Sequence, residues 1–118
     1  MKNCGDFQNI YLYRPYVDMR RQSSGLAEIV AEFEVGDPLS GDLFLFRSRR
    51  RNLIKAIYWD KNGFAMWTKR LSADTFPWPK SLDLDTVTLN VEQLRWLLDG
   101  VDYWKIKRYK DLDFKKIL

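Results

Sequence analysis

Apolar side chains recur along the chain in two patterns, one typical of β-strands and one typical of α-helices. The β-prone runs at residues 10–13 and 43–46 predict short strands. The second run is apolar at every position, which is typical of a strand covered on both faces rather than one at a sheet edge. Residues 86–89 predict another short strand. Apolar residues spaced three and four apart at residues 26–33 and 91–99 predict two amphipathic helices.

The ends of the two predicted helices carry sequence signals of their own. Asp18 or a serine of Ser23-Ser24 is expected to cap the first helix. Gly36-Asp37-Pro38 is expected to stop it, because proline cannot continue the helical hydrogen bonds. Asn90 is the expected N-cap of the second helix, and Gly100 is its expected end.

A β-hairpin is predicted around the tetrapeptide Asp60-Lys61-Asn62-Gly63. Residues 53–59 and 64–71 flank it, and Gly63 suits the left-handed conformation that closes such a turn. The later segment Phe76-Pro77-Trp78-Pro79 is expected to be extended, since its two prolines exclude a helix and a central strand.

The register of this hairpin decides which side chains lie opposite Lys55. A three-residue loop places Lys69 there, and a two-residue turn ending in the glycine places Arg70 there. Either register sets two cations across from each other, which is destabilising unless an anion is bound. In the first register Trp59 and Trp67 share a sheet face with Lys55, as in a platform that stacks bases. Burial in the core is the alternative that we favour for both tryptophans.

Together these elements predict an α+β fold, a small single domain in which two helices pack on an antiparallel sheet of about four strands with a central β-hairpin. The 118 residues fit one domain, and five Trp, six Tyr and seven Phe supply large side chains for its core. We expect the domain to span residues 1–104. A basic C-terminal tail, residues 105–118, is expected to follow, either as a second phosphate-contacting arm or as a solvated terminus.

Composition argues against most catalytic and metal chemistry. The chain has no histidine and a single cysteine, Cys4, which removes the usual general base, the Ser-His and Cys-His nucleophile pairs and most zinc sites. Asp18, Asp42, Asp60 and Asp74 are candidates for a Mg²⁺ site of a nuclease, but caps and turns account for each of them. We therefore predict that the protein is not an enzyme and has no catalytic residue, metal or cofactor.

The chain is expected to be a cytoplasmic protein without a membrane partner. No run approaches the roughly 20 apolar residues that span a bilayer, and the N-terminus lacks the apolar region of a signal peptide. One cysteine cannot form an internal disulfide, which suits a reducing compartment.

Positive charge gathers in one part of the sequence. The formal net charge is +4, but residues 42–80 carry nine Lys and Arg against three Asp and Glu. Five of these cations lie within residues 46–55, and they are Arg47, Arg49, Arg50, Arg51 and Lys55. Such density beside a predicted strand favours binding to a polyanion, with a nucleic-acid backbone as the expected one. The alternative is that these charges only keep the sheet soluble.

Several segments occur in an order and spacing that match a known family. They are Val17-Asp18-Met19-Arg20-Arg21 with Gly25-Leu26, residues 41–50 and 52–55, Trp59-Asp60 with Gly63, Lys69-Arg70-Leu71, Phe76-Pro77-Trp78-Pro79, and Gln93-Leu94 with residues 97–102. On these segments the chain resembles TnpB, the small accessory protein encoded by the second open reading frame of bacterial insertion sequences of the sixty-six family. The resemblance spans about residues 10–104. The family more often has Thr where Val17 stands, and nothing carries over to the tail after Trp104.

The resemblance implies an accessory protein that acts in transposition with a separate, larger transposase, which supplies the catalytic carboxylates. We predict a non-catalytic helper that binds DNA at the element ends. The alternative is an adaptor that binds the transposase without contacting DNA. The oligomeric state stays open. The predicted DNA contacts are Arg20, Arg21, Arg47, Arg49, Arg50, Arg51, Lys55, Lys69 and Arg70.

Overall fold

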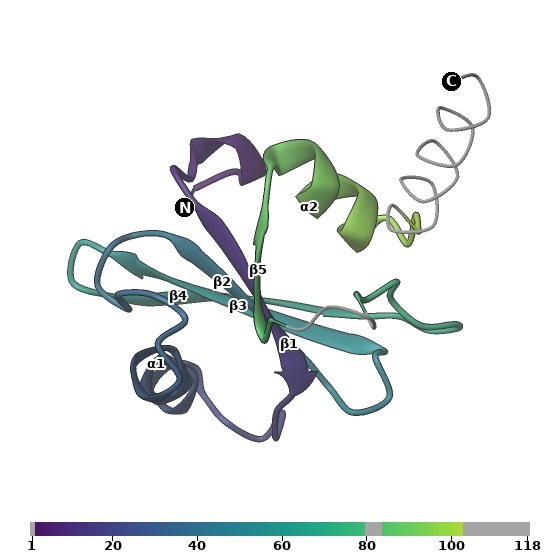
Figure 1. Cartoon of the computed structure of the whole chain (residues 1–118), viewed down its shortest axis with the longest axis horizontal. Coiled ribbons are helices and arrows are strands. Elements are labelled where there is room, and N and C mark those ends of the chain that lie inside the picture. Colours follow the sequence, from purple (N-terminus) through teal and green to yellow (C-terminus); the bar gives the residue numbers. More distant parts are fainter. Residues whose placement is uncertain (1, 80–83, 103–118) are drawn as a thin grey trace.

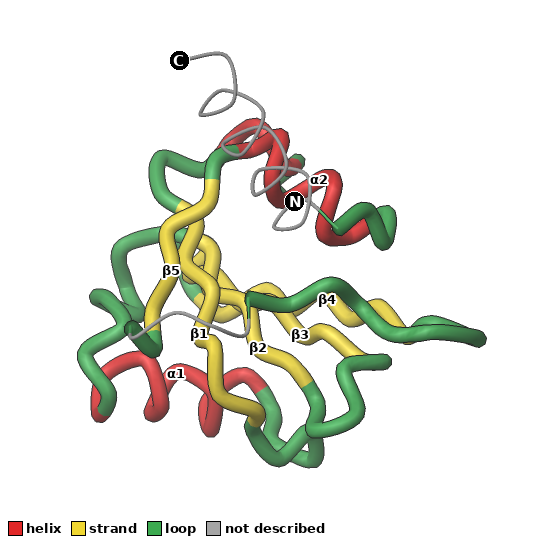
Figure 2. Tube along the Cα trace, turned by 45° about the vertical axis from the view of Figure 1, so that its right-hand side comes forward, coloured by secondary structure: helices red, strands yellow, loops and turns green. Residues whose placement is uncertain are grey.

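A five-stranded sheet forms the middle layer of the molecule, with one helix on each face (Figures 1 and 2). The structure is a computed structural model and describes residues 2–79 and 84–102. In chain order its elements are the 3-10 helix η1 (Cys4–Asp6), strand β1 (Ile10–Tyr16), helix α1 (Ser23–Glu32), strands β2 (Leu43–Arg47), β3 (Leu53–Asp60), β4 (Gly63–Arg70) and β5 (Thr86–Leu89), and helix α2 (Val91–Leu98). The predicted basic tail lies outside the described residues.

The strands lie in the order β4-β3-β2-β1-β5, with β1 and β2 parallel and every other neighbouring pair antiparallel. The α+β class and the two packed helices are confirmed, but the sheet has five strands and is mixed, not antiparallel with about four. The reason is that α1 lies between β1 and β2 in the chain. A helical crossover returns the chain to the same end of the sheet, so the next strand runs parallel to the first. β2 is the middle strand, as its apolar sequence predicts.

Side chains alternate between the two faces of the sheet and build a separate core on each. The core under α2 includes Leu12, Leu43, Leu45, Tyr58, Phe76, Trp78, Leu94 and Leu97. The core under α1 includes Tyr13, Leu26, Ile29, Val30, Phe44, Phe46 and Ile57. Because β2 contributes to both cores, it carries no polar side chain before its last residue.

The starts of the two helices differ in how well local signals predict them. Asn90 caps α2, with its side chain accepting from the backbone of Gln93, and Gly100 follows the helix with a left-handed φ of 80°. Both features are confirmed. The N-cap of α1 is instead Gln22, which makes no side-chain capping bond. The predicted caps, Asp18 and Ser23-Ser24, are therefore wrong.

The end of α1 shows a different use of glycine from the expected one. Glu34 adopts the left-handed conformation, with φ of 54°, and the Val35 amide donates to the Val30 carbonyl at 3.0 Å. This pattern is a Schellman ending, so the helix has already stopped before Gly36. A Cβ at Gly36 would lie 2.8 Å from the Phe44 ring. Gly36 thus permits close packing against β2.

The β3–β4 hairpin is confirmed, but it lies at one edge of the sheet and not at its centre, and both predicted registers are wrong. Asp60 pairs with Gly63, so the loop is Lys61-Asn62, and its first residue takes a left-handed φ of 57°. Gly63 is the first residue of β4 and does not take the left-handed position. In this register Lys55 lies opposite Thr68, so no cation faces it across the strands.

Candidate nucleic-acid interface

The last residue of β2 and the β2–β3 turn carry four of the nine predicted DNA contacts at one end of the sheet, Arg47, Arg49, Arg50 and Arg51. The Arg51 amide donates to the Ser48 carbonyl at 3.0 Å, which closes the turn, and Arg51 itself has a left-handed φ of 58°. The Ser48 hydroxyl bonds Asn52 at 3.1 Å and accepts from the Leu53 amide at 3.2 Å. The central residues of this fixed turn, residues 49 and 50, present their side chains to solvent.

Arg47 differs from its neighbours because it is half-buried and held by backbone. Its Nε donates to the Arg14 carbonyl at 2.9 Å. Burial lowers the pKa of the Arg47 guanidinium, and the positive charges of Arg51 and Arg14 lower it further. The repulsion shows that several cations gather here. We call Arg47, Arg49, Arg50 and Arg51 the arginine cluster.

Tyr16 lies beside this cluster, and the sequence pattern does not reveal it. The residue is 54% exposed. The Arg47 and Arg49 guanidinium carbons lie 5.9 and 5.8 Å from its centroid, within the range of a cation–π contact. Tyr16 and Arg47 are partners in the parallel β1–β2 register. Tyr16 therefore reaches the cluster through the pairing of two strands that are distant in the sequence, which no local pattern indicates.

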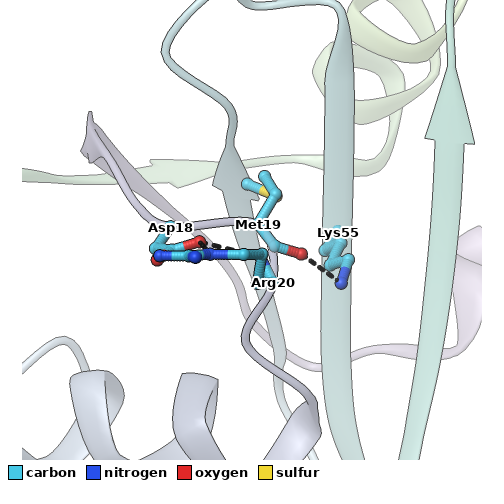
Figure 3. A network of polar contacts seen from close by, with 4 residues as sticks. All are labelled: Asp18, Met19, Arg20 and Lys55. Atoms are coloured by element: carbon cyan, nitrogen blue, oxygen red, sulfur yellow. Dashed lines mark hydrogen bonds and ion pairs between the residues drawn. The ribbon is translucent and has the colours of Figure 1, made fainter.

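Lys55 does not belong to this exposed surface. It is 8% exposed, and its Nζ donates to the Met19 carbonyl at 2.7 Å (Figure 3). The same Nζ also donates to the Arg21 carbonyl at 3.0 Å. The ammonium group is thus used to fix the segment that precedes α1. The predicted phosphate contact at Lys55 does not fit this position.

The cations of that segment have different surroundings. Arg20 forms an ion pair with Asp18 at 2.6 Å, also seen in Figure 3. The hydrogen bonds from Arg20 hold the pKa of the Asp18 carboxyl well below its ordinary value. Arg21 is exposed. Arg20 is therefore already neutralised by a neighbour, whereas Arg21 presents its charge to solvent.

The two cations at the end of β4 point to opposite faces of the sheet. Lys69 pairs with Ile54 on the α2 face, and its Nζ donates to the Leu98 carbonyl of α2 at 2.6 Å. Arg70 pairs with Leu53, directly after the β2–β3 turn, and is exposed. The structure therefore brings Arg70 to the end of the sheet that carries the arginine cluster, and it uses Lys69 to hold α2.

The two tryptophans of the hairpin do not share a face, so the predicted stacking platform is wrong. Trp67 pairs with Ala56 and packs against the core under α2. Trp59 lies on the α1 face, where its ring meets that of Phe64 edge-on at 5.1 Å. The shift in register separates them, because moving a strand by one residue reverses the face of each side chain.

The described residues offer neither a metal site nor a membrane-spanning helix. In residues 2–79 and 84–102, no group of three His, Cys, Asp or Glu is placed to hold a metal ion. No helix in that part of the chain is long and apolar enough to cross a membrane.

Comparison with known proteins accounts for the order of the segments that carry the resemblance. A model of the family described as IS66 Orf2 like protein matches residues 8–108. The chain belongs to this family. The IS66 Orf2-like match reaches residue 108, a little beyond the predicted limit of the resemblance. Family membership gives the chain an accessory role associated with a transposable element.

Two curated relatives of this IS66 Orf2-like chain come from Sinorhizobium fredii. The uncharacterized protein y4jC is 35% identical over 92 residues, which is 78% of each chain. The uncharacterized protein y4hO is 35% identical over 103 residues, which is 87% of this chain and 89% of the relative. No solved structure matches.

Proposed function

We propose that this protein is a non-catalytic DNA-binding helper of the element's transposase, and that the arginine cluster with Arg70 contacts DNA phosphates. The observation that carries the proposal is positive charge for which the described residues supply no ion-pair partner. The ion pairs between described residues are Arg14–Asp85 and Arg20–Asp18. Neither involves the cluster. A phosphate backbone supplies the missing negative charge and releases counterions when it binds.

The geometry of the turn supports the same proposal. Its backbone is fixed by the Ser48 hydrogen bonds, so Arg49 and Arg50 emerge from a rigid base at the end of the sheet. Phosphate contacts on a fixed base lose less conformational entropy than contacts from a free loop. Such contacts position a protein on DNA and carry no sequence information.

Salt-dependent binding tests the proposal. We expect the full chain to bind duplex DNA at low salt and to lose affinity steeply as salt rises. The double variant Arg49→Gln with Arg50→Gln should reduce the slope of log affinity against log salt by about two, since each phosphate contact contributes about 0.9. Lys61→Gln with Arg95→Gln is the matched control. It removes the same charge from exposed positions on the β3–β4 loop and on α2, and it should keep the slope.

Equal losses in the two double variants would mean that net charge, and not the turn, governs binding. An absence of DNA binding by the wild-type chain at low salt would overturn the proposal.

The adaptor remains the second candidate, because Phe33 and Leu39 are large apolar side chains that are more than half exposed after α1. Exposed apolar groups of this kind are typical of protein contacts. Co-purification with the element's transposase after nuclease treatment would favour the adaptor. Association that disappears on nuclease treatment would favour bridging by DNA.

A further inference from the structure

The end of β1 departs from regular pairing beside the arginine cluster. Leu12 pairs with Leu45, and the next paired position is Tyr16 with Arg47. Four residues of β1 therefore match two residues of β2, which marks a bulge. Pro15 lies inside it and has no N–H to donate to the ladder. Bulges of this kind change the direction of a side chain and are common beside binding sites.

Backbone groups freed by the bulge hold the surroundings of Tyr16 in place. The Arg14 carbonyl accepts from Arg47 Nε at 2.9 Å and from Trp78 Nε1 at 2.9 Å. Just after Tyr16, the Val17 amide donates to the Arg47 carbonyl at 3.1 Å. The Tyr16 ring therefore extends from a backbone that hydrogen bonds hold in place. One of its two guanidinium neighbours, Arg47, is held by a hydrogen bond as well.

The exposure of this ring is unusual for its position. Tyr11 and Tyr13 on the same strand pack into or against the core under α1, whereas the bulge turns Tyr16 outward. Its two guanidinium neighbours differ in mobility. Arg47 is held by the Arg14 carbonyl, whereas Arg49 is exposed to solvent. Aromatic rings and guanidinium planes are the two groups on which nucleobases stack.

We infer that Tyr16 and Arg49 form a stacking site for an unpaired nucleobase, so that the protein prefers DNA with a short single-stranded end over blunt duplex. The inference rests on the proposed DNA binding of the arginine cluster. Bases inside a duplex hide their faces against each other, so away from the duplex ends the ring can take a base only when it is unpaired.

The test is binding of the full chain to three labelled DNAs at one salt concentration: a blunt duplex, the same duplex with a short thymidine overhang, and the same duplex with an abasic overhang. The abasic overhang keeps the phosphates and lacks the bases. We expect the thymidine overhang to bind about 5- to 150-fold more tightly than the abasic one, the range for one stacked base.

Substitution of the ring separates stacking from charge. Tyr16→Ser should abolish the difference between the two overhangs and leave affinity for the blunt duplex within about twofold, since it removes no charge. Tyr16→Phe keeps the stacking face and should retain the difference. Circular dichroism of each variant shows whether it is folded.

The outcomes distinguish this inference from the function on which it rests. Salt-dependent binding to all three DNAs with equal affinity for the two overhangs would overturn the stacking site and leave the proposed function intact. The stacking site would also be wrong if Tyr16→Ser kept the preference for bases. No binding to any of the three DNAs at low salt would contradict both the stacking site and the proposed DNA-binding function.

Discussion

Lys55 and the arginines of the β2–β3 turn lie within a few residues of one another, yet the fold uses their charges in opposite ways. Lys55 is buried on the α1 face and donates to two backbone carbonyls. Arg49 and Arg50 are exposed at the end of the sheet. The difference teaches that a dense basic run is not one functional unit. Position along the strand decides which cations hold the fold together and which remain available to a partner.

The burial of Lys55 follows from its place in β3. It lies on the same face as Leu53 and Ile57, and its long apolar stem can pack there while the ammonium reaches the edge of the core. The Met19 and Arg21 carbonyls accept from it, and backbone acceptors in a partly buried segment need such partners. Lys55 therefore positions the segment before α1.

The largest effect is expected from Lys55→Ala, which should lower the free energy of unfolding by about 2–4 kcal/mol. The variant removes the buried stem and leaves the Met19 and Arg21 carbonyls without their donor. Lys55→Met keeps most of the stem and should cost about half as much. Urea denaturation measures both. Arg49→Gln with Arg50→Gln is the comparison and should change stability by about 0.5 kcal/mol or less, as exposed substitutions do.

The distinction between a structural Lys55 and DNA-binding arginines would be wrong in one case. This is if Lys55→Met, at a temperature where it is folded, reduced the salt slope of DNA binding as strongly as the double arginine variant. Lys55 would then have to reach DNA despite its internal hydrogen bonds.

Arg47 is intermediate between the buried Lys55 and the exposed arginines of the turn. Its substitution should therefore lower both the stability and the salt slope of DNA binding, each by a smaller amount. Arg47→Gln removes the donor to the Arg14 carbonyl, but Trp78 Nε1 still satisfies that carbonyl. We therefore expect a loss of about 1–2 kcal/mol in the free energy of unfolding. The salt slope should fall by about one if the guanidinium also contacts a phosphate. Urea denaturation and salt titration of the same preparation measure the two effects, and an unchanged slope would assign Arg47 to structure alone.

Local signals in the sequence predict the elements that depend on neighbouring residues. The cap at Asn90, the stop at Gly100, the hairpin and the central place of the apolar strand are all of this kind. The hairpin register was not predictable in the same way, because a lysine takes the left-handed position that glycine usually fills. The observed register differs by one residue from the first predicted register. This difference places Trp67 on the face opposite to Lys55 and puts Thr68, not a cation, across from Lys55.

The features of the candidate site that the sequence does not predict depend on contacts between segments that are distant in the chain. The parallel β1–β2 pairing brings Tyr16 beside Arg47, and the bulge that turns the ring outward appears only in that pairing. Likewise, the acceptors for Lys55 lie more than thirty residues earlier in the chain. Residue type identified the basic end of the sheet correctly, but only the tertiary structure separated Lys55 and Lys69, which hold other segments, from the exposed arginines.

Arg20 supplies a third case, a cation that is exposed but already paired, and here the smallest effect is expected. Asp18→Asn removes the counter-charge of Arg20. It should strengthen binding to duplex DNA about two- to threefold at low salt, because Arg20 becomes free to attract phosphate. Glu28→Gln, which removes an exposed acid on α1, is the control for net charge. An equal gain in both variants would show that the position of Arg20 is irrelevant.

The same variant has a consequence for pH that follows from the lowered pKa of Asp18. A carboxyl whose pKa is lower in the folded state stabilises the fold above its ordinary pKa of 3.8, and this contribution is lost as acid protonates it. Wild type should therefore be more stable than Asp18→Asn at neutral pH, and the difference should shrink as the pH falls below about 4. The pair lies at the surface, so the difference is expected to be small. Urea denaturation of both chains across this pH range measures it, and a difference that grew in acid would contradict the assigned ion pair.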